Sequence, residues 1–170
     1  MRRLAIWVQL IGLTGLSAGC FTPSAPVDQP AKCVADADVE SLDDQVLQLV
    51  NLERAKAGLD PVVKSETLSK FAGDYACRMI EGGFFAHTDP DTGYGPGERA
   101  AAGDYAFWSV GENLAAGQPT AADVMRVWME SDSHRANILD SRWKEIGIGV
   151  RTGGEFSIYW VQEFGDPAGS

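Results

Sequence analysis

Histidine is scarce in this chain, and its cysteines lack the spacing of a zinc site. His87 and His134 are the only two histidines among 170 residues. The three cysteines contain no Cys-x-x-Cys pair, so they do not indicate a cysteine-based zinc site. Both histidines lie in polar segments near Gly or Ser and beside aromatic residues. We therefore expect one shared polar site that contains both imidazoles.

Long apolar runs are also missing, apart from one at the start of the chain. Residues 4–16 follow two arginines and are mostly apolar, but the run is too short to span a bilayer comfortably. Small residues at 17–19 then precede Cys20, a pattern that resembles a bacterial lipobox. We expect a lipoprotein signal peptide over residues 1–19, cleavage before Cys20 and acylation of that residue. An ordinary secretory signal with a chance Cys is the alternative.

Basic residues are outnumbered by acidic ones. Removal of residues 1–19 leaves 12 Lys and Arg against 24 Asp and Glu, a net charge of −12. An acidic chain is a poor candidate for binding nucleic acid or anionic lipid headgroups. We therefore expect no nucleic-acid partner. We also expect that the lipid on Cys20 alone attaches the protein to a membrane of the bacterial cell envelope.

Cys33 and Cys77 remain as a pair once Cys20 is assigned to the lipid. Disulfides persist in exported proteins, so we expect a bridge between the two. The bridge would close a loop of 45 residues, which is worth about 4 kcal/mol in the chain-entropy account. Two buried free thiols are the alternative.

The chain after the signal peptide divides into a tether and a domain. Residues 20–38 contain several Pro with scattered Ala, Ser and Asp, which is typical of a flexible tether. Residues 39–167 are sufficient for one folded domain with a sizeable core. Capping residues and helical periodicity predict three main helices in it. Their N-caps are Ser41, Ser65 and Thr120, and glycines at 58 and 82–83 end the first two.

Shorter helical pieces are expected at residues 98–102 and 134–139, and strands are expected in two places. Residues 107–110 are predicted to form a strand that leads into Gly111-Glu112-Asn113. Residues 146–150 and 156–164 are separated by Gly153-Gly154 and predict an antiparallel hairpin. Helices around a small antiparallel sheet give an α+β fold with three layers. The residues expected to face the core include Val124, Val127, Trp128 and Trp160.

Several short motifs occur in order between about residue 42 and residue 165. They lie at residues 51–59, 85–87, 111–115, 128–139, 146–150 and 160–165. Together they resemble the CAP superfamily of cysteine-rich secretory, antigen 5 and plant pathogenesis-related proteins, also called SCP domains, and in particular its bacterial branch. The resemblance implies an α-β-α sandwich, in agreement with the fold predicted from the residues.

The resemblance also implies a central cleft, which in many members is lined by two His and two Glu. Carried over to this chain, three of these residues are His87, Glu112 and His134. The position of the second Glu holds Ser131, which we expect to line the cleft together with Asn113. Glu130 is one residue away, and a one-residue step turns a helical side chain by about 100°. We therefore do not expect Glu130 to substitute.

Two imidazoles and a carboxylate suit zinc or another divalent cation, with one position open to water. We expect His87 and His134 to be ligands, and Glu112 to be either a third ligand or an acceptor that orients an imidazole. The same groups could serve acid–base hydrolysis, with Glu112 and His134 as the catalytic residues. Ser131 and Ser133 flank His134, but neighbours in sequence rarely reach one another as nucleophile and base.

The function expected from these residues is ligand binding by a lipid-anchored module of the cell envelope. The ligand would be a lipid, a peptide or a protein, and a monomer is favoured. The alternative is a metal-assisted hydrolase that acts on an envelope peptide or ester. The absence of the second Glu favours binding, because Glu112 is then the only named candidate for a general base. A purely structural spacer would leave the two histidines without a role.

Overall fold

The computed structural model describes residues 31–35 and 37–169. The predicted signal peptide, the lipidation site Cys20 and most of the predicted tether lie outside these residues. The helices are α1 (Ala37–Lys56), α2 (Glu66–Gly82), α3 (Pro96–Ala102), α4 (Ala121–Glu130) and α5 (Asp132–Ile138). The strands are β1 (Val63–Lys64), β2 (Phe107–Ala116), β3 (Glu145–Thr152) and β4 (Ile158–Pro167).

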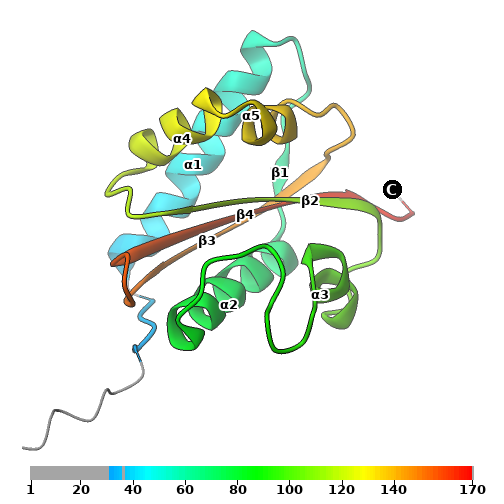
Figure 1. Cartoon of the computed structure of the whole chain (residues 1–170). Coiled ribbons are helices and arrows are strands. Elements are labelled where there is room, and N and C mark those ends of the chain that lie inside the picture. Colours follow the sequence, from blue (N-terminus) through cyan, green and yellow to red (C-terminus); the bar gives the residue numbers. More distant parts are fainter. Residues whose placement is uncertain (1–30, 36, 170) are drawn as a thin grey trace, which may run out of the picture.

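The strands form one sheet in the order β1-β3-β4-β2, between two layers of helices (Figure 1). β1 runs parallel to β3, and the other pairs are antiparallel. Helices α1, α4 and α5 cover one face, and α2 and α3 cover the other. The α+β class and the three layers predicted from the sequence are confirmed. β2 lies at the edge of the sheet, so segments from both helical layers can meet around it.

Two clusters of apolar side chains hold the layers together. One lies between the sheet and α1, α4 and α5, and it contains Trp128 and Trp160, both fully buried as predicted. The other lies between the sheet and α2 and includes Met79 and Tyr159. On α4 the prediction was wrong for Val127, which is only half-buried, whereas Met125 is buried.

The ends of the helices follow local chemistry in most places. Thr120 is the N-cap of α4 as predicted, and its hydroxyl accepts a hydrogen bond from the backbone N–H of Asp123. Gly83 ends α2 in the left-handed conformation, at φ 65°. The predicted start of α1 at Ser41 was wrong, because the helix begins at Ala37. No Gly or Pro lies between these two residues, so a favourable cap at Ser41 did not prevent the helix from starting earlier.

Two features of the sheet differ from the prediction. β2 does not end before Gly111-Glu112-Asn113 but continues through these residues to Ala116. Pairing with β4 holds them in the strand although their β-propensity is low. The two-residue strand β1 was not predicted, since so short a run carries no readable alternation.

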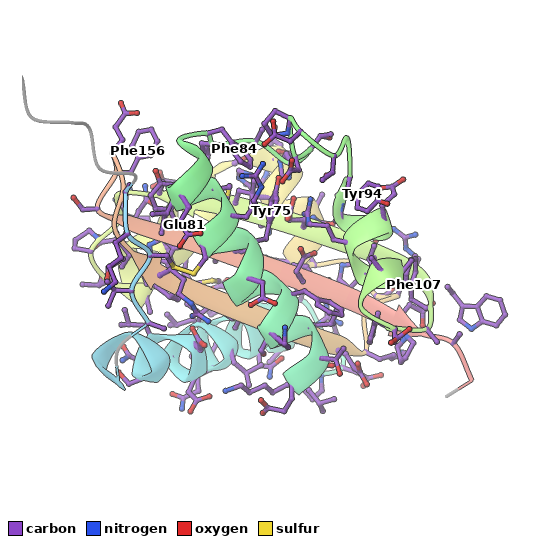
Figure 2. The ribbon with its side chains drawn as sticks, turned by 90° about the horizontal axis from the view of Figure 1, so that it is seen from below. Tyr75, Glu81, Phe84, Tyr94, Phe107 and Phe156 are labelled. Atoms are coloured by element: carbon purple, nitrogen blue, oxygen red, sulfur yellow. A yellow bond between two sulfur atoms is a disulfide. The ribbon has the colours of Figure 1, made fainter. Side chains whose placement is uncertain are left out.

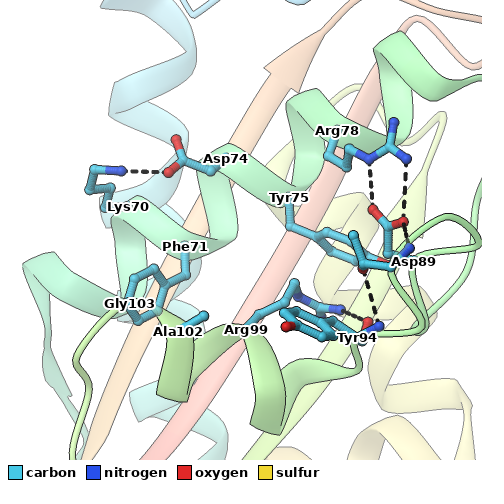
Figure 3. A pocket seen from close by; sticks show the side chains of 11 residues that line it. Lys70, Phe71, Asp74, Tyr75, Arg78, Asp89, Tyr94, Arg99, Ala102 and Gly103 are labelled. Atoms are coloured by element: carbon cyan, nitrogen blue, oxygen red, sulfur yellow. Dashed lines mark hydrogen bonds and ion pairs between the residues drawn. The ribbon is translucent and has the colours of Figure 1, made fainter.

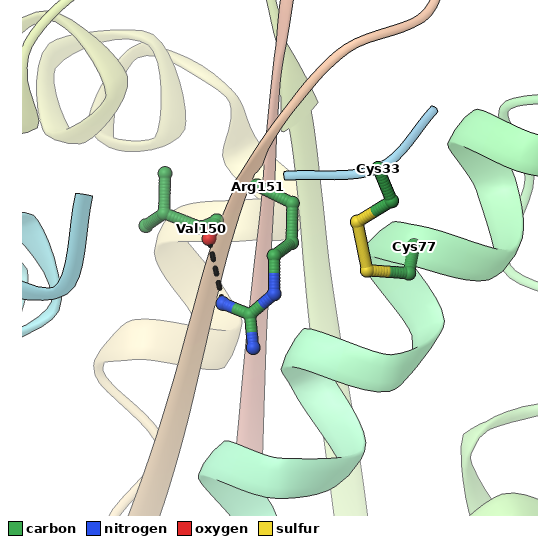
Figure 4. The surroundings of a disulfide bond; sticks show 4 residues. All are labelled: Cys33, Cys77, Val150 and Arg151. Carbon is green, nitrogen blue, oxygen red and sulfur yellow. Dashed lines mark hydrogen bonds between the residues drawn. A yellow bond between two sulfur atoms is a disulfide. The ribbon is translucent and has the colours of Figure 1, made fainter. Parts of the chain in front are cut away.

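The predicted disulfide between Cys33 and Cys77 is present, with 5.1 Å between the two Cα atoms (Figure 4). It fastens the N-terminal segment to α2. Val34 also pairs with Thr152 at the end of β3 through two backbone hydrogen bonds. The chain therefore enters the domain beside the β3–β4 hairpin. Within the described residues, no helix has the length and apolar character needed to cross a bilayer.

Candidate functional site

The edge strand β2 carries the centre of the site. Successive side chains of a strand point to opposite faces, so Glu112 and Asn113 turn toward different helical layers. His87 lies in the loop that follows α2, and His134 lies on α5. Gly111 allows α5 and the segment after it to approach, because a Cβ there would lie 2.8 Å from the side chains of Asn137 and Trp143.

Glu112 is buried and is held by two partners. Its side chain is only 1% exposed. Oε1 lies 2.7 Å from Nδ1 of His87, and Oε2 accepts a hydrogen bond from Nη2 of Arg99. The His87 side chain is 55% exposed, so this imidazole presents its other edge to solvent. The hydrogen bond to Glu112 raises the pKa of His87 above 6.5, against the opposing effects of burial and of Arg99.

A second carboxyl group lies directly opposite Glu112. Glu163 of β4 pairs with Glu112 in the strand register, and its carboxyl oxygen lies 3.5 Å from Nη2 of Arg99. Burial raises the pKa of Glu163 well above 4.5, and the charge of Glu112 raises it further. Burial therefore favours the protonated form of Glu163, and two carboxyl groups share one guanidinium group in the interior of the site.

Arg99 also fastens the loop that carries His87. Its guanidinium carbon lies 3.4 Å from the ring centroid of Tyr75, and Nη1 donates to the carbonyl groups of His87 and Tyr94 at 2.8 and 3.1 Å. The hydroxyl of Tyr75 donates to the carbonyl of Ala86 at 2.6 Å. Burial raises the pKa of Tyr75 to about 12, so it remains a donor. Two side chains from different helices thus fix the loop next to His87.

The sequence interpretation missed both Arg99 and Glu163. Glu163 follows Gln162 within a strand that is otherwise mostly apolar, and such consecutive buried polar residues were a signal of a site. Arg99 carried no comparable signal, because its role depends on the packing of α3 beside α2 and β2.

Amides hold the other half of the site. Asn113 is fully buried, and its amide donates to the backbone carbonyl of His134 at 3.2 Å and to Gln162 at 2.9 Å. Asn137 donates to Asn113 Oδ1 and to the carbonyl of Glu112 at 3.1 and 3.0 Å. These bonds fix the backbone of α5 against β2. Asn113 therefore lies beneath the site and supports it.

The imidazole of His134 is less well satisfied than that of His87. Its Nδ1 is buried and has no hydrogen-bond partner among residues 31–35 and 37–169. Burial lowers the pKa of His134 below 6.5, and the charge of His87 lowers it further.

Ser131 is the N-cap of α5, and its hydroxyl oxygen lies 3.2 Å from that of Ser133. Glu130 turns outward and pairs with Arg126 at 3.3 Å on the exposed side of α4.

These contacts limit how a divalent cation would fit. Both oxygens of Glu112 are engaged, one by His87 and one by Arg99. In the described part of the chain, no group of three or more His, Cys, Asp or Glu side chains is arranged to hold a metal ion. The residues do not fit a site with Glu112 as a direct ligand. Glu112 instead orients His87, and Nδ1 of His134 is buried without a partner among the described residues.

A cavity of about 410 Å³ lies beside this site, on the other side of Arg99 (Figure 3). Side chains of α2, α3 and the loop between them line it, including Phe71, Tyr75 and Tyr94. Its cations are mostly paired, since Lys70 binds Asp74 at 2.6 Å and Arg78 binds Asp89 at 2.6 Å. His87, Glu112 and His134 do not line it, so the cavity and the polar site are neighbours that share Arg99.

Comparison with known proteins places the chain in a family. The model of the cysteine-rich secretory protein family matches residues 47–164, a range that includes both histidines and Glu112. The uncharacterized protein YkwD of Bacillus subtilis is 35% identical over 130 residues, which are 76% of this chain and 49% of YkwD. The uncharacterized membrane protein YlbC of the same organism is 28% identical over 106 residues, 62% of this chain and 30% of YlbC. The chain thus spans half or less of the length of these relatives.

Solved structures show the same fold. An outer surface protein of Borrelia burgdorferi superposes with a TM-score of 0.70 at 23% identity, over 81% of this chain and 98% of that protein. An extracellular protein of Bacillus anthracis that contains an SCP domain superposes with a TM-score of 0.68 at 23% identity, over 78% of this chain and 44% of that chain. On the match of the family model, the chain belongs to the cysteine-rich secretory protein family, the CAP superfamily.

Proposed function

We propose that this protein is an exported CAP module of the bacterial cell envelope, anchored by a lipid on Cys20, that binds an envelope ligand at His87, Glu112 and His134. The short apolar run before Cys20 supports the anchor. Two structural neighbours are an extracellular protein and an outer surface protein, which supports an extracytoplasmic location. The disulfide between Cys33 and Cys77 fits the same compartment.

One observation carries the preference for binding over turnover. The carboxylate of Glu112 is held between Nδ1 of His87 and the guanidinium of Arg99. A general base has to take a proton in the transition state, and neither carboxylate oxygen of Glu112 is free to do so, because both are already hydrogen-bonded. Glu112 is instead suited to hold His87 in one orientation and one tautomer. The arrangement presents fixed polar groups to a ligand without a free base.

We assign His87 and His134 as the ligands of a divalent cation, with zinc as the first candidate. A bound cation would supply a Lewis-acidic position for an oxygen atom of the ligand. His87 would use the nitrogen that Glu112 leaves free. Asn113 and Asn137 would keep α5, and thus His134, in place.

Calorimetric titration of zinc into the metal-free mature protein tests the assignment. We expect binding that weakens below about pH 6, because protonated imidazole cannot ligate a metal. The His87→Ala/His134→Ala double variant should lose the binding. Glu130→Ala is the matched control, since it removes a nearby exposed carboxylate and should leave the affinity unchanged. Equal affinity in the double variant and the wild type would overturn the assignment.

A separate experiment distinguishes ligand binding from hydrolysis. Cleavage of an envelope peptide or ester at a kcat near ~10 s⁻¹, abolished by Glu112→Gln in a protein that still folds, would establish the hydrolase alternative.

A further inference from the structure

Two aromatic rings are exposed at the end of the domain where the chain enters it. Phe85 follows α2 and Phe156 lies in the turn between β3 and β4, with 43% and 41% of each residue exposed. Their ring centroids are 5.9 Å apart, and both rings pack edge-on against the buried Tyr159, at 6.2 and 5.7 Å. The pair is therefore supported from below and held with its outer faces in solvent.

The N-terminal segment meets the fold at the same place. Ala31 and Cys33 pack against the apolar cluster that contains Tyr159. The carbonyl of Lys32 lies against Gly153, next to the turn that carries Phe156. Figure 2 shows the blue N-terminal segment entering beside Phe156. The disulfide and the pairing of Val34 with Thr152 prevent this entry point from shifting.

We propose that Phe85 and Phe156 dock on the surface of the membrane to which Cys20 is anchored. The proposal rests on the lipid anchor of the proposed function. It adds a second contact between the protein and the membrane, whereas the sequence led us to expect attachment through the lipid alone. From Cys20 to Ala31 is a step of 11 residues, which spans at most about 40 Å. A domain of this size has a radius of gyration of about 14 Å, so the entry end is the end that the anchor brings to the bilayer most readily.

The chemistry of this end suits an uncharged lipid surface. Exposed aromatic side chains gain free energy when they leave water at the boundary between headgroups and acyl chains. Glu81 and Glu155 are exposed nearby and Lys32 is the exposed cation of the entry segment, so these residues supply no excess of positive charge that would attract anionic headgroups. The surface that fits this end of the domain is therefore zwitterionic lipid.

The most exposed aromatic residue of the domain lies elsewhere and does not compete for this role. Trp108 is 76% exposed at the opposite end of β2. That end is about 30 Å from the hairpin at the usual rise of a strand. Tyr94, 46% exposed, lies on the loop beside α3, apart from Phe156 in Figure 2. Trp108 and Tyr94 are therefore exposed aromatic residues that should stay in water when Phe85 and Phe156 contact the membrane.

The test uses tryptophan reporters and brominated lipid, which quenches tryptophan only at close range. The mature chain from Cys20 is coupled through the Cys20 thiol to a maleimide lipid in phosphatidylcholine vesicles with brominated acyl chains. Phe156→Trp and Phe85→Trp are the two reporters, and Tyr94→Trp is the control with similar exposure. Thermal melting confirms that each variant folds, and unbrominated vesicles give the reference emission.

We expect the emission added by each reporter to be largely lost on brominated vesicles, while that added by Tyr94→Trp is retained. Equal emission from the reporters and the control would overturn the docking surface. The anchor is tested separately by mass spectrometry of the N-terminus of the protein extracted from cells. An unmodified N-terminus there would refute the lipid anchor and the docking on its membrane, whereas an acylated Cys20 with unquenched reporters would refute the docking alone.

Discussion

His87 and His134 reach the edge strand β2 from opposite helical layers, and they are held in opposite ways. His87 is fixed through its side chain, since Nδ1 bonds to Glu112, and Arg99 fastens both the loop and the carboxylate. His134 is fixed through its backbone by Asn113, while its own Nδ1 is buried without a partner among the described residues. The resemblance to the family implies a second carboxylate on the side of His134, and here that position is Ser131.

The His87 half is the more complete half of the site. Its charged groups pair with one another, and one guanidinium is shared by Glu112 and Glu163, although Nε of Arg99 is buried without a partner among the described residues. The His134 half leaves an unmet hydrogen bond that a ligand could satisfy. A buried polar atom without a partner costs about 1–3 kcal/mol, so a ligand that supplies the missing contact gains an equivalent advantage.

The largest test of this comparison removes the cation of the complete half. Arg99→Met would leave Glu112 and Glu163 buried and facing each other without their shared partner. Loss of one member of a buried ion pair typically costs about 3–5 kcal/mol. We expect a fall of this size in the free energy of unfolding, measured by urea denaturation at pH 7.

Arg126→Met is the matched control for Arg99→Met. Arg126 is also a helical arginine paired with a carboxylate, but its side chain is 59% exposed. Exposed pairs contribute about 0–1 kcal/mol, so this variant should melt nearly like the wild type. Similar losses in the two variants would show that Arg99 does not neutralise the carboxyl pair.

The second test supplies the carboxylate that the incomplete half lacks. Ser131 is the N-cap of α5 and His134 is the third residue of the helix, and the side chains of these two positions lie close together in a capping box. Ser131→Glu would therefore give the imidazole of His134 an acceptor or an added ligand. Such supporting contacts change metal affinity by about 10–100-fold. We expect zinc to bind at least about tenfold more tightly to this variant, measured by calorimetry at pH 7.5.

Ser133→Glu is the control for Ser131→Glu. It adds the same charge one residue from His134, where a side chain is turned about 100° away. If both variants bind zinc equally tightly, the gain comes from general attraction and not from a completed site.

More of the fold than of the candidate site could be predicted from the sequence. Capping at Thr120, glycines after α2 and the spacing of apolar residues follow local rules, and they gave α2, α4 and the β3–β4 hairpin. The family motifs gave His87, Glu112 and His134. Arg99 and Glu163 depend on strand register and on the packing of α3, and register is set by the whole sheet and by the side chains it buries. A sequence pattern therefore locates the histidines but not the charges that surround them.

The smallest expected effect is a separation of the two histidine titrations in the metal-free protein. The pKa of His87 is raised and that of His134 is lowered from 6.5. The charged His87 therefore stabilises the fold below about pH 6.5, and this contribution is lost as pH rises through its raised pKa. The neutral His134 stabilises the fold above about pH 6.5, and this contribution is lost as pH falls through its lowered pKa.

Proton NMR of the two imidazoles can test this order, because the chain has only two histidines and each single His→Ala variant assigns the other. In Glu112→Gln the hydrogen bond to a charged acceptor is gone, so the pKa of His87 should move down toward that of His134. Glu130→Gln removes a carboxylate that already pairs with Arg126 and should leave both titrations in place. If Glu112→Gln leaves the pKa of His87 unchanged, the carboxylate does not hold that imidazole. The proposed difference between the two halves, in which only His87 is held through its side chain, would then be wrong.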